Sequence, residues 1–224
     1  MPTPTWERLP TAKRDAVLAA AEAEFGERGF SGASLNTISR EAGISKGSLF
    51  QYFVDKADMY AHLAELASLR IRAAMEAEVA RLPVDTDFFG SFEALIGAWV
   101  GYFYDHPRDR ALTAATNLEP DALARSAVRD TVNRHYLEVL TPLVELAHDS
   151  GQLRADTDRD ALVALLLLLL PHLALAPHVS GLDPVLGLRD GDRDRATAQA
   201  RRMLRLILDP HRPAPGSYTS GKAS

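Results

Sequence analysis

Apolar residues recur every three or four positions along most of the chain, which is the spacing of one face of an α-helix. No stretch shows the sustained alternation and β-branched enrichment of a half-buried strand. The pattern therefore predicts an all-α protein. The first long helix is expected to begin near Thr11 and to end at Gly29, because glycine tolerates the positive φ of a helix end. Its apolar face consists of Val17, Leu18, Ala21 and Phe25.

Two short helices follow, and each is preceded by a serine that can cap its first turn. The apolar positions of the first, after Ser34, are Leu35, Ile38 and Ala42. Ser45 introduces the second, residues 46–52, in which Leu49 and Phe53 lie four apart on the inward side.

The rest of the chain is predicted to be helical as well. A fourth helix is expected from Asp55 to about Leu82, with a second carboxylate, Asp58, in its positive first turn. Further helices are expected at about 87–105, 107–116, 121–150, 158–178 and 193–208, which makes about nine in all. We expect an N-terminal domain over residues 1–62, a larger helical domain over 63–209, and a disordered tail over 210–224, which is rich in Pro, Gly and Ser.

Residues 34–53 have the organisation of a helix-turn-helix. Gly43, Ile44 and Ser45 form a turn of a length that sets two helices at a steep angle. The outward surface of the second helix comprises Lys46, Gly47, Ser48, Gln51 and Tyr52. Its side chains can donate to phosphates or base edges, and the glycine lets the backbone approach a groove closely. Short capped helices also occur in ordinary bundles, so spacing alone leaves DNA binding and plain packing as alternatives.

Residues 13–63 closely resemble the N-terminal domain of the tetracycline-repressor (TetR) family of bacterial transcriptional regulators. The resemblance rests on the order and spacing of caps, glycines, core residues and outward residues in 17–21, Phe25, Gly29-Phe30, 38–53 and Lys56. Beyond residue 63 only the architecture is similar, at the 151–154 turn and at the His106-Pro107 helix start. The resemblance implies a helix-turn-helix DNA-binding domain joined to a helical domain for ligand binding and dimerisation.

The resemblance also implies which residues contact DNA. Lys46 and Gly47 sit where the family approaches bases. Contacts to phosphate or groove wall are implied for Ser48, Phe50, Gln51, Tyr52 and Lys56, with Asn36 and the capping Ser34 contributing from the preceding helix. Lys56 also lies at a helix start, where free N–H groups and the helix dipole favour a phosphate. Phe50 departs from the family, in which tyrosine is common, and Ser39 stands where alanine is usual.

The charge of the chain does not by itself indicate a nucleic-acid binder. The net charge is −5, and residues 1–60 carry seven basic and eight acidic residues. DNA binding would then depend on a few well-placed cations, with modest, salt-sensitive non-specific affinity. The near-neutral charge of this segment supports an alternative, a helical ligand-binding or scaffolding protein that has lost DNA binding.

A DNA-binding module this small presents one short helix, so a homodimer with recognition helices about 34 Å apart is expected on double-stranded operator DNA. The dimer candidates are residues 158–178, which are almost wholly apolar, and residues 193–208. The latter carry an apolar stripe of Ala196, Ala200, Met203, Leu204 and Ile207, with Arg201, Arg202 and Arg205 outside it. The alternative is that both are ordinary core helices.

The middle helices are rich in residues that combine an apolar body with a polar tip, a composition that suits a small-molecule cavity as well as a core. The pocket candidates are Trp99, Tyr102, Phe103, His106, Asn117, Tyr136 and His172. In the TetR family such a cavity binds an effector. The resemblance therefore implies a repressor that binds a palindromic operator and is released by a small molecule.

Other sequence features exclude several classes of protein. The chain has no cysteine and its N-terminus lacks an export signal, so a cytoplasmic protein is expected. Residues 161–179 are apolar but interrupted by proline and histidine, which makes a poor membrane span, so no membrane partner is expected. No histidine spacing matches a metal site and no catalytic motif is present, so we expect no metal, no cofactor and no enzyme.

Overall fold

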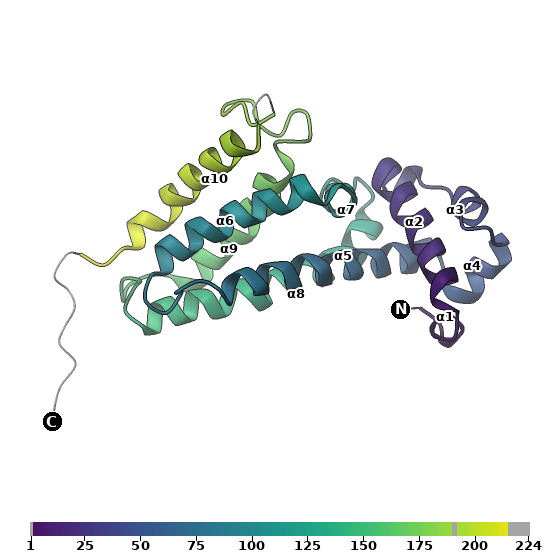
Figure 1. Cartoon of the computed structure of the whole chain (residues 1–224), viewed down its shortest axis with the longest axis horizontal. Coiled ribbons are helices and arrows are strands. Elements are labelled where there is room, and N and C mark those ends of the chain that lie inside the picture. The colour runs from purple at the N-terminus through teal and green to yellow at the C-terminus, as the bar shows by residue number, and fades with distance from the viewer. Residues whose placement is uncertain (1, 190–191, 215–224) are drawn as a thin grey trace. The chain divides into compact units, whose positions relative to one another are not determined.

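The computed structural model describes residues 2–189 and 192–214. These residues form ten α-helices and one short 3₁₀ helix (η1), and they contain no strand (Figure 1). The elements are α1 Pro4–Glu7, α2 Thr11–Gly32, α3 Leu35–Glu41, α4 Lys46–Tyr52, α5 Lys56–Val79, α6 Phe88–Asp105, α7 Pro107–Asn117, α8 Ala122–Asp149, α9 Arg159–Leu175, α10 Arg193–Leu208 and η1 Asp209–His211. The predicted all-α fold is confirmed. The helix beyond the nine predicted is α1, which the periodicity did not reveal.

Packing divides the chain into two compact units. Unit 1 comprises Met1–Arg72 and Phe103–His135, and unit 2 comprises Ala73–Tyr102 and Tyr136–Ser224. The boundaries fall inside α5, α6 and α8, so α7 and the first part of α8 belong to the same unit as the helix-turn-helix. The domain boundary predicted at residue 62 rests on where the resemblance to a DNA-binding domain ends and not on packing, so it stays a prediction.

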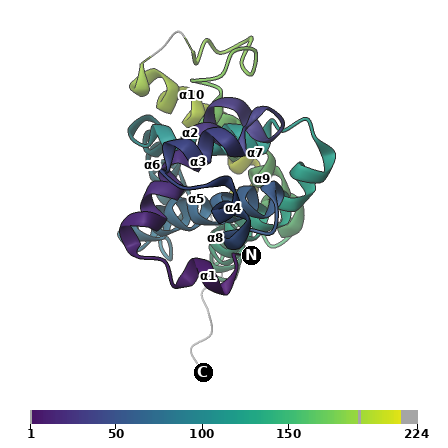
Figure 2. The ribbon, with the colours of Figure 1, turned by 90° about the vertical axis from the view of Figure 1, so that its right-hand side faces the viewer.

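Unit 1 is organised around α2, which packs along α3 and α7 (Figure 2). At Gly26 the helices α2 and α7 are so close that a Cβ would lie 2.9 Å from Cβ of Ala111. The core consists of Val17, Ala21, Phe25, Ile38, Leu49, Phe53, Met59, Tyr60 and Leu63. Gly29 has a φ of 64°, as its predicted role requires, and after this break one further turn carries α2 to Gly32.

Unit 2 is built from α6, the second part of α8, α9 and α10. Its core includes Phe88, Phe92, Ile96, Leu140, Val144, Leu162, Leu166, Leu173, Ala196, Ala200, Leu204 and Leu208. Gln152, which is buried, fixes the start of α6: its Oε1 accepts the Phe88 N–H at 2.5 Å, and its Nε2 donates to the Val84 carbonyl at 3.0 Å. A side chain 64 residues away thus satisfies an N–H that the helix itself leaves free.

Two details of unit 2 differ from the sequence-based expectations. The helix expected to run to about residue 178 is α9, which contains Pro171 and ends at Leu175. Arg201 was expected outside the packed face of α10, yet its Nε donates to the Glu93 carbonyl at 3.0 Å. It can approach α6 there because Gly97 presents no side chain.

The end of the chain is only partly described. Pro210 and His211 belong to η1, and the His211 carbonyl accepts the Arg154 N–H at 2.9 Å. Ordered structure therefore extends past the expected tail boundary, whereas residues 215–224 of that predicted tail lie outside the described part. Among the helices described, none is long and apolar enough to cross a membrane.

His62 in unit 1 provides a pH test of this packing. Its ring lies 5.9 Å from Trp6 and 5.7 Å from Phe53, and burial lowers its pKa below the usual 6.5 against the opposing pull of Asp58, Glu7 and Glu65. The unfolded chain therefore takes up the proton more readily, so this group's contribution to stability is complete above about pH 6.5 and is lost as the pH falls towards the lowered pKa.

We expect the free energy of unfolding, measured in urea, to fall more steeply from about pH 7 to about pH 5 in the parent than in His62→Phe, which keeps the ring packing. His148→Gln, a histidine change at the end of α8, serves as the control and should keep most of the parent's slope. Equal slopes for the parent and His62→Phe would contradict the argument.

Candidate nucleic-acid interface

The turn between α3 and α4 is fixed by backbone hydrogen bonds. Gly43 has a φ of 66°, its N–H donates to the Arg40 carbonyl at 3.1 Å, and the Ile44 N–H donates to the Ser39 carbonyl at 2.9 Å. This pair of bonds is the Schellman arrangement, which satisfies carbonyls at a helix end and reverses the chain. The helix-turn-helix angle therefore depends on one residue that occupies the left-handed region.

Both short helices have the serine caps predicted for them. The Ser34 hydroxyl accepts the Thr37 N–H at 3.4 Å, and the Ser45 hydroxyl accepts the Ser48 N–H at 3.1 Å. The Ser34 N–H in turn donates to Glu24 of α2 at 2.8 Å, which ties the start of α3 to the long helix behind it. A capping serine and a buried carboxylate together hold α3 in place.

Helix α4 has a buried face and an exposed one. Leu49 and Phe53 are 1% and 2% exposed, as the pattern predicts for the inward side. Lys46, Gly47, Phe50 and Gln51 lie on the exposed side. Lys46 has no ion pair within the described residues, and a Cβ on Gly47 would meet only Ser45 Oγ, at 3.7 Å. The exposed side is thus an open surface that carries a cation and an amide.

Two neighbouring contact candidates are partly engaged within the protein. Ser48 is half-buried and its Oγ lies 2.9 Å from Ser45 Oγ. The Lys56 ammonium lies over the Phe30 ring, 4.8 Å from its centroid. On α3, the side chain of Asn36 is exposed.

Tyr52 does not lie on the outward surface as expected. It is 9% exposed and its ring centroid lies 5.9 Å from that of Trp6 in α1. The expectation failed because α1, which covers this end of α4, was not predicted. The arrangement gives Tyr52 a packing role, whereas its expected contact with DNA stays a prediction.

Three residues that matter here were missed in the sequence: Thr3, Trp6 and Glu119. The signal for α1 is present, since Pro4 stands in the first turn directly after Thr3, a common helix start. Glu119 had no signal, because its partners are about 90 residues away: its carboxylate accepts the Phe30 N–H at 2.9 Å and the Ser31 hydroxyl at 3.1 Å.

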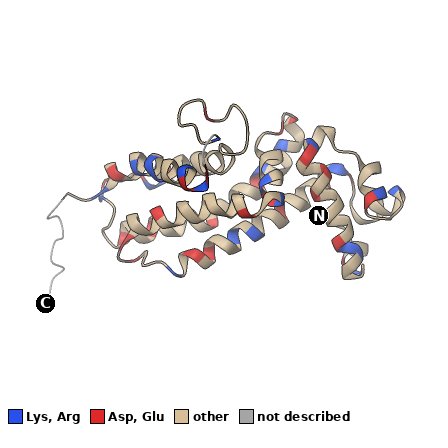
Figure 3. Cartoon of the chain, turned by 45° about the horizontal axis from the view of Figure 1, so that its top comes forward, with Lys and Arg blue, Asp and Glu red and all other residues tan. Residues whose placement is uncertain are grey.

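Several acidic residues of unit 1 are engaged in hydrogen bonds and ion pairs within the protein. Glu22 of α2 and Asp109 of α7 both accept hydrogen bonds from Arg70 of α5, at 2.9 and 2.5 Å. Glu119 is 3% exposed, and burial, with a smaller effect from this carboxylate, raises the pKa of Tyr60. None of these three carboxylates is paired with Lys46. Charges of both signs are interspersed on the described chain (Figure 3).

Of the four pocket candidates in unit 2, Trp99 and Tyr136 contact each other and His172 is exposed. Trp99 and Tyr136 meet edge to face with centroids 5.4 Å apart, and the Trp99 Nε1–H donates to the Leu170 carbonyl at 2.8 Å. Tyr102 is buried. His172 is exposed, and its Nε2 lies 2.7 Å from the Leu182 carbonyl oxygen.

The candidates in unit 1 are likewise dispersed. Phe103 is fully buried, whereas His106, the N-cap of α7, is exposed. Asn117 uses both ends of its amide locally: Nδ2 donates to the Thr113 carbonyl at 2.9 Å, and Oδ1 accepts from Arg129 at 2.7 Å. Its role as a ligand-binding residue stays a prediction.

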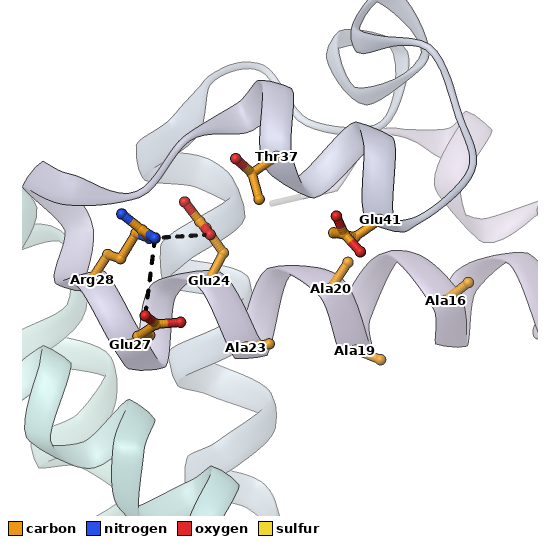
Figure 4. Close-up of a pocket in the computed structure, with 9 residues that line it drawn as sticks. All are labelled: Ala16, Ala19, Ala20, Ala23, Glu24, Glu27, Arg28, Thr37 and Glu41. Atoms are coloured by element: carbon orange, nitrogen blue, oxygen red, sulfur yellow. Dashed lines mark ion pairs between the residues drawn. The ribbon is translucent and has the colours of Figure 1, made fainter.

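Unit 1 also has an open groove of about 530 Å³ between α2 and α3 (Figure 4). One wall is formed by small side chains of α2, namely Ala16, Ala19, Ala20 and Ala23. Its cation, Arg28, is paired with Glu24 at 3.6 Å and with Glu27 at 4.0 Å. No pocket candidate from the sequence lines this groove.

Comparison with known proteins agrees with the helix-turn-helix. The family described as "Bacterial regulatory proteins, tetR family" matches residues 17–63. The HTH-type transcriptional repressor AcnR of Corynebacterium glutamicum is 28% identical over 194 residues, which cover 81% of this chain and 93% of AcnR.

Solved structures share the fold over almost the whole chain. A TetR family transcriptional regulator from Chloroflexus aurantiacus has a TM-score of 0.60 at 25% identity, covering 94% of this chain and 96% of that one. FadR from Bacillus subtilis, in complex with stearoyl-CoA, has a TM-score of 0.67 at 16% identity, covering 87% and 97%. The chain thus carries an N-terminal segment of the tetR family of bacterial regulatory proteins, and beyond that segment it is similar in sequence and fold to transcriptional regulators along most of its length.

Proposed function

We propose that the protein is a homodimeric repressor that binds a palindromic operator through α4 and is released by a small-molecule effector. The observation that carries the proposal is the surface of α4, where Lys46, Gly47 and Gln51 are exposed while Leu49 and Phe53 anchor the helix from behind. A short helix held in this way has the form of the second helix of a helix-turn-helix, which enters the major groove. AcnR is a transcriptional repressor, and this relative supports repression rather than activation.

Within this proposal the contacts divide by their chemistry. Lys46 approaches base edges, because it is an exposed cation without an ion pair among the described residues, and Gly47 lets the backbone come close. Contacts to phosphates or to the wall of the groove are made by Ser48, Gln51, Lys56, Asn36 and Ser34. Phe50 is 48% exposed and has only apolar contact to offer, to a sugar or a thymine methyl. Tyr52 packs α4 against α1, and only its hydroxyl could contact DNA.

The dimer is proposed to form through α9 and α10. Leu165 and Leu168 of α9 are 48% and 72% exposed, and Leu206 of α10 is 73% exposed, which is unusual for large aliphatic side chains on regular helices. Ala161 and Ala164 continue the same exposed face of α9. A second copy that buries this face would place two recognition helices on one duplex.

The effector is proposed to act by binding one conformation better than the other, as any shift of DNA affinity requires. Trp99 and Tyr136 are the pocket candidates with the best-defined mutual geometry. Within unit 1, Asp109 on Arg70 and Glu119 on Phe30 link α7 and the α7–α8 connection to α2 and α5. A displacement of α7 would therefore be felt by the helix-turn-helix through these bonds.

The proposed base contact is tested with Lys46→Ala. A duplex selected from a random pool by the parent protein is the probe, and we expect its affinity to fall roughly 10- to 100-fold, with relaxed sequence preference. Arg81→Ala, which removes one positive charge from unit 2, is the matched control and should bind like the parent. If Lys46→Ala binds like the parent across a salt series, the proposed base contact of Lys46 is excluded. If the parent selects no duplex, the alternative without DNA binding gains the support.

The proposed phosphate contact is tested with Lys56→Met, which keeps the apolar stem on Phe30 and removes the charge. We expect specific and non-specific duplexes to be weakened alike, and the slope of log K against log salt to become shallower by about 2 for the dimer, about 1 for each Lys56 lost. Fluorescence anisotropy from about 50 to about 200 mM salt measures both quantities. An unchanged slope would show that the ammonium serves the Phe30 ring rather than DNA.

The proposed dimer is tested with Leu168→Glu. We expect a monomer in sedimentation velocity with unchanged helical circular dichroism, because a carboxylate would be buried without a partner in the interface. Leu123→Glu is the control, since Leu123 of α8 is even more exposed, at 84%, but lies outside α9 and α10. A Leu168→Glu protein that remains dimeric would exclude this face.

A further inference from the structure

The C-terminal end of α4 is capped by Thr3, which lies just before α1 and about 50 residues earlier in the chain. The last carbonyls of a helix have no partner within it. In α4 the Gln51 carbonyl accepts the Thr3 hydroxyl at 2.5 Å, and the Tyr52 carbonyl accepts the Thr3 N–H at 2.9 Å. One residue thus satisfies two carbonyls of a helix that is only seven residues long.

The hydroxyl of Thr3 is committed to α4 instead of to its own helix. Thr3 is the N-cap of α1, where a threonine usually bonds to an N–H of the first turn, yet α1 has no side-chain cap bond. The hydroxyl therefore serves the end of α4 at the expense of α1, whose first turn begins with Pro4.

Trp6 fastens the same end through its ring. It is 3% exposed, and its centroid lies 4.9 Å from Phe53 and 5.9 Å from Tyr52 and from His62 (Figure 1 shows α1 beside α4). The tryptophan covers the junction between the end of α4 and the start of α5. Hydrogen bonds and ring packing therefore act on one turn of helix.

We propose that Thr3 and Trp6 are positioning residues for operator binding, which hold the C-terminal turn of α4 so that Lys46 to Gln51 meet the groove at one fixed angle. This inference rests on the proposed function of α4. A seven-residue helix is far below the length at which helices are stable alone, so the placement of its side chains depends on what holds its ends. Thr3 and Trp6 act through α4 and do not themselves contact DNA.

The test uses Thr3→Val, which keeps the shape and the N–H but removes the hydroxyl, in the full-length protein. Thr3→Ser restores a hydroxyl, and Thr5→Val is the matched control, because Thr5 is exposed on α1 and has no hydrogen bond from its side chain within the described structure. Melting temperatures of all variants are compared first. Amide hydrogen exchange then follows the peptide that contains α4, without DNA.

We expect Thr3→Val to speed exchange at the end of α4 roughly threefold to tenfold, the range expected for one hydrogen bond. The affinity for the duplex selected by the parent should fall by a similar factor with an unchanged salt slope, while Thr3→Ser and Thr5→Val match the parent. Unchanged exchange in Thr3→Val overturns the inference. A fall in affinity without faster exchange would mean that Thr3 acts on DNA directly rather than through α4.

The two proposals fail in different ways. If the parent selects no duplex from the pool, the proposed DNA binding is lost, while the exchange experiment still decides whether Thr3 holds the end of α4. If the parent selects a duplex and Thr3→Val changes neither exchange nor affinity, DNA binding stands and the positioning role is excluded.

Discussion

The structure of unit 1 depends on one constraint: a helix of seven residues cannot hold its own position, so α4 has to be fixed by its surroundings. The Ser45 hydroxyl satisfies its first turn and Thr3 its last. Leu49 and Phe53 anchor its back in a core shared with α2 and α5. With both ends and the back engaged, the remaining side is free to face outwards, and a rigid exposed side is what recognition of a groove requires.

The charged residues of unit 1 are also used to hold its helices in place. Carboxylates hold unit 1 together: Glu119, which is buried, accepts hydrogen bonds from the end of α2, and Arg70 of α5 joins the buried Asp109 of α7 to the half-buried Glu22 of α2. Removing one partner of such a group would leave a carboxylate of Asp109 or Glu119 short of hydrogen bonds in the interior, which is unfavourable. These acids therefore hold the helices of unit 1 together.

Sequence reasoning succeeded where structure is local. The serine caps, Gly43 in the left-handed region and the inward pair on α4 depend on neighbours a few positions away, and the structure has them as predicted. It failed where a contact joins distant segments. The burial of Tyr52 depends on Trp6, the start of α6 on Gln152, and the end of α2 on Glu119, and no periodicity encodes such pairings. The exposed side of α4 was thus predictable except at Tyr52, whereas the elements that hold the helix were not.

The small number of available cations has a consequence for how the protein would find its site. Each phosphate neutralised by a cation adds roughly 0.9 to the salt slope, so a surface that offers Lys46 and Lys56 from each protomer gains little non-specific affinity. Most of the binding free energy must then come from base edges and from the second half-site, both of which demand an accurately placed α4. A regulator with few charges to attract DNA depends more than others on the geometry of its recognition helix. The cap on that helix from Thr3 is consistent with this requirement.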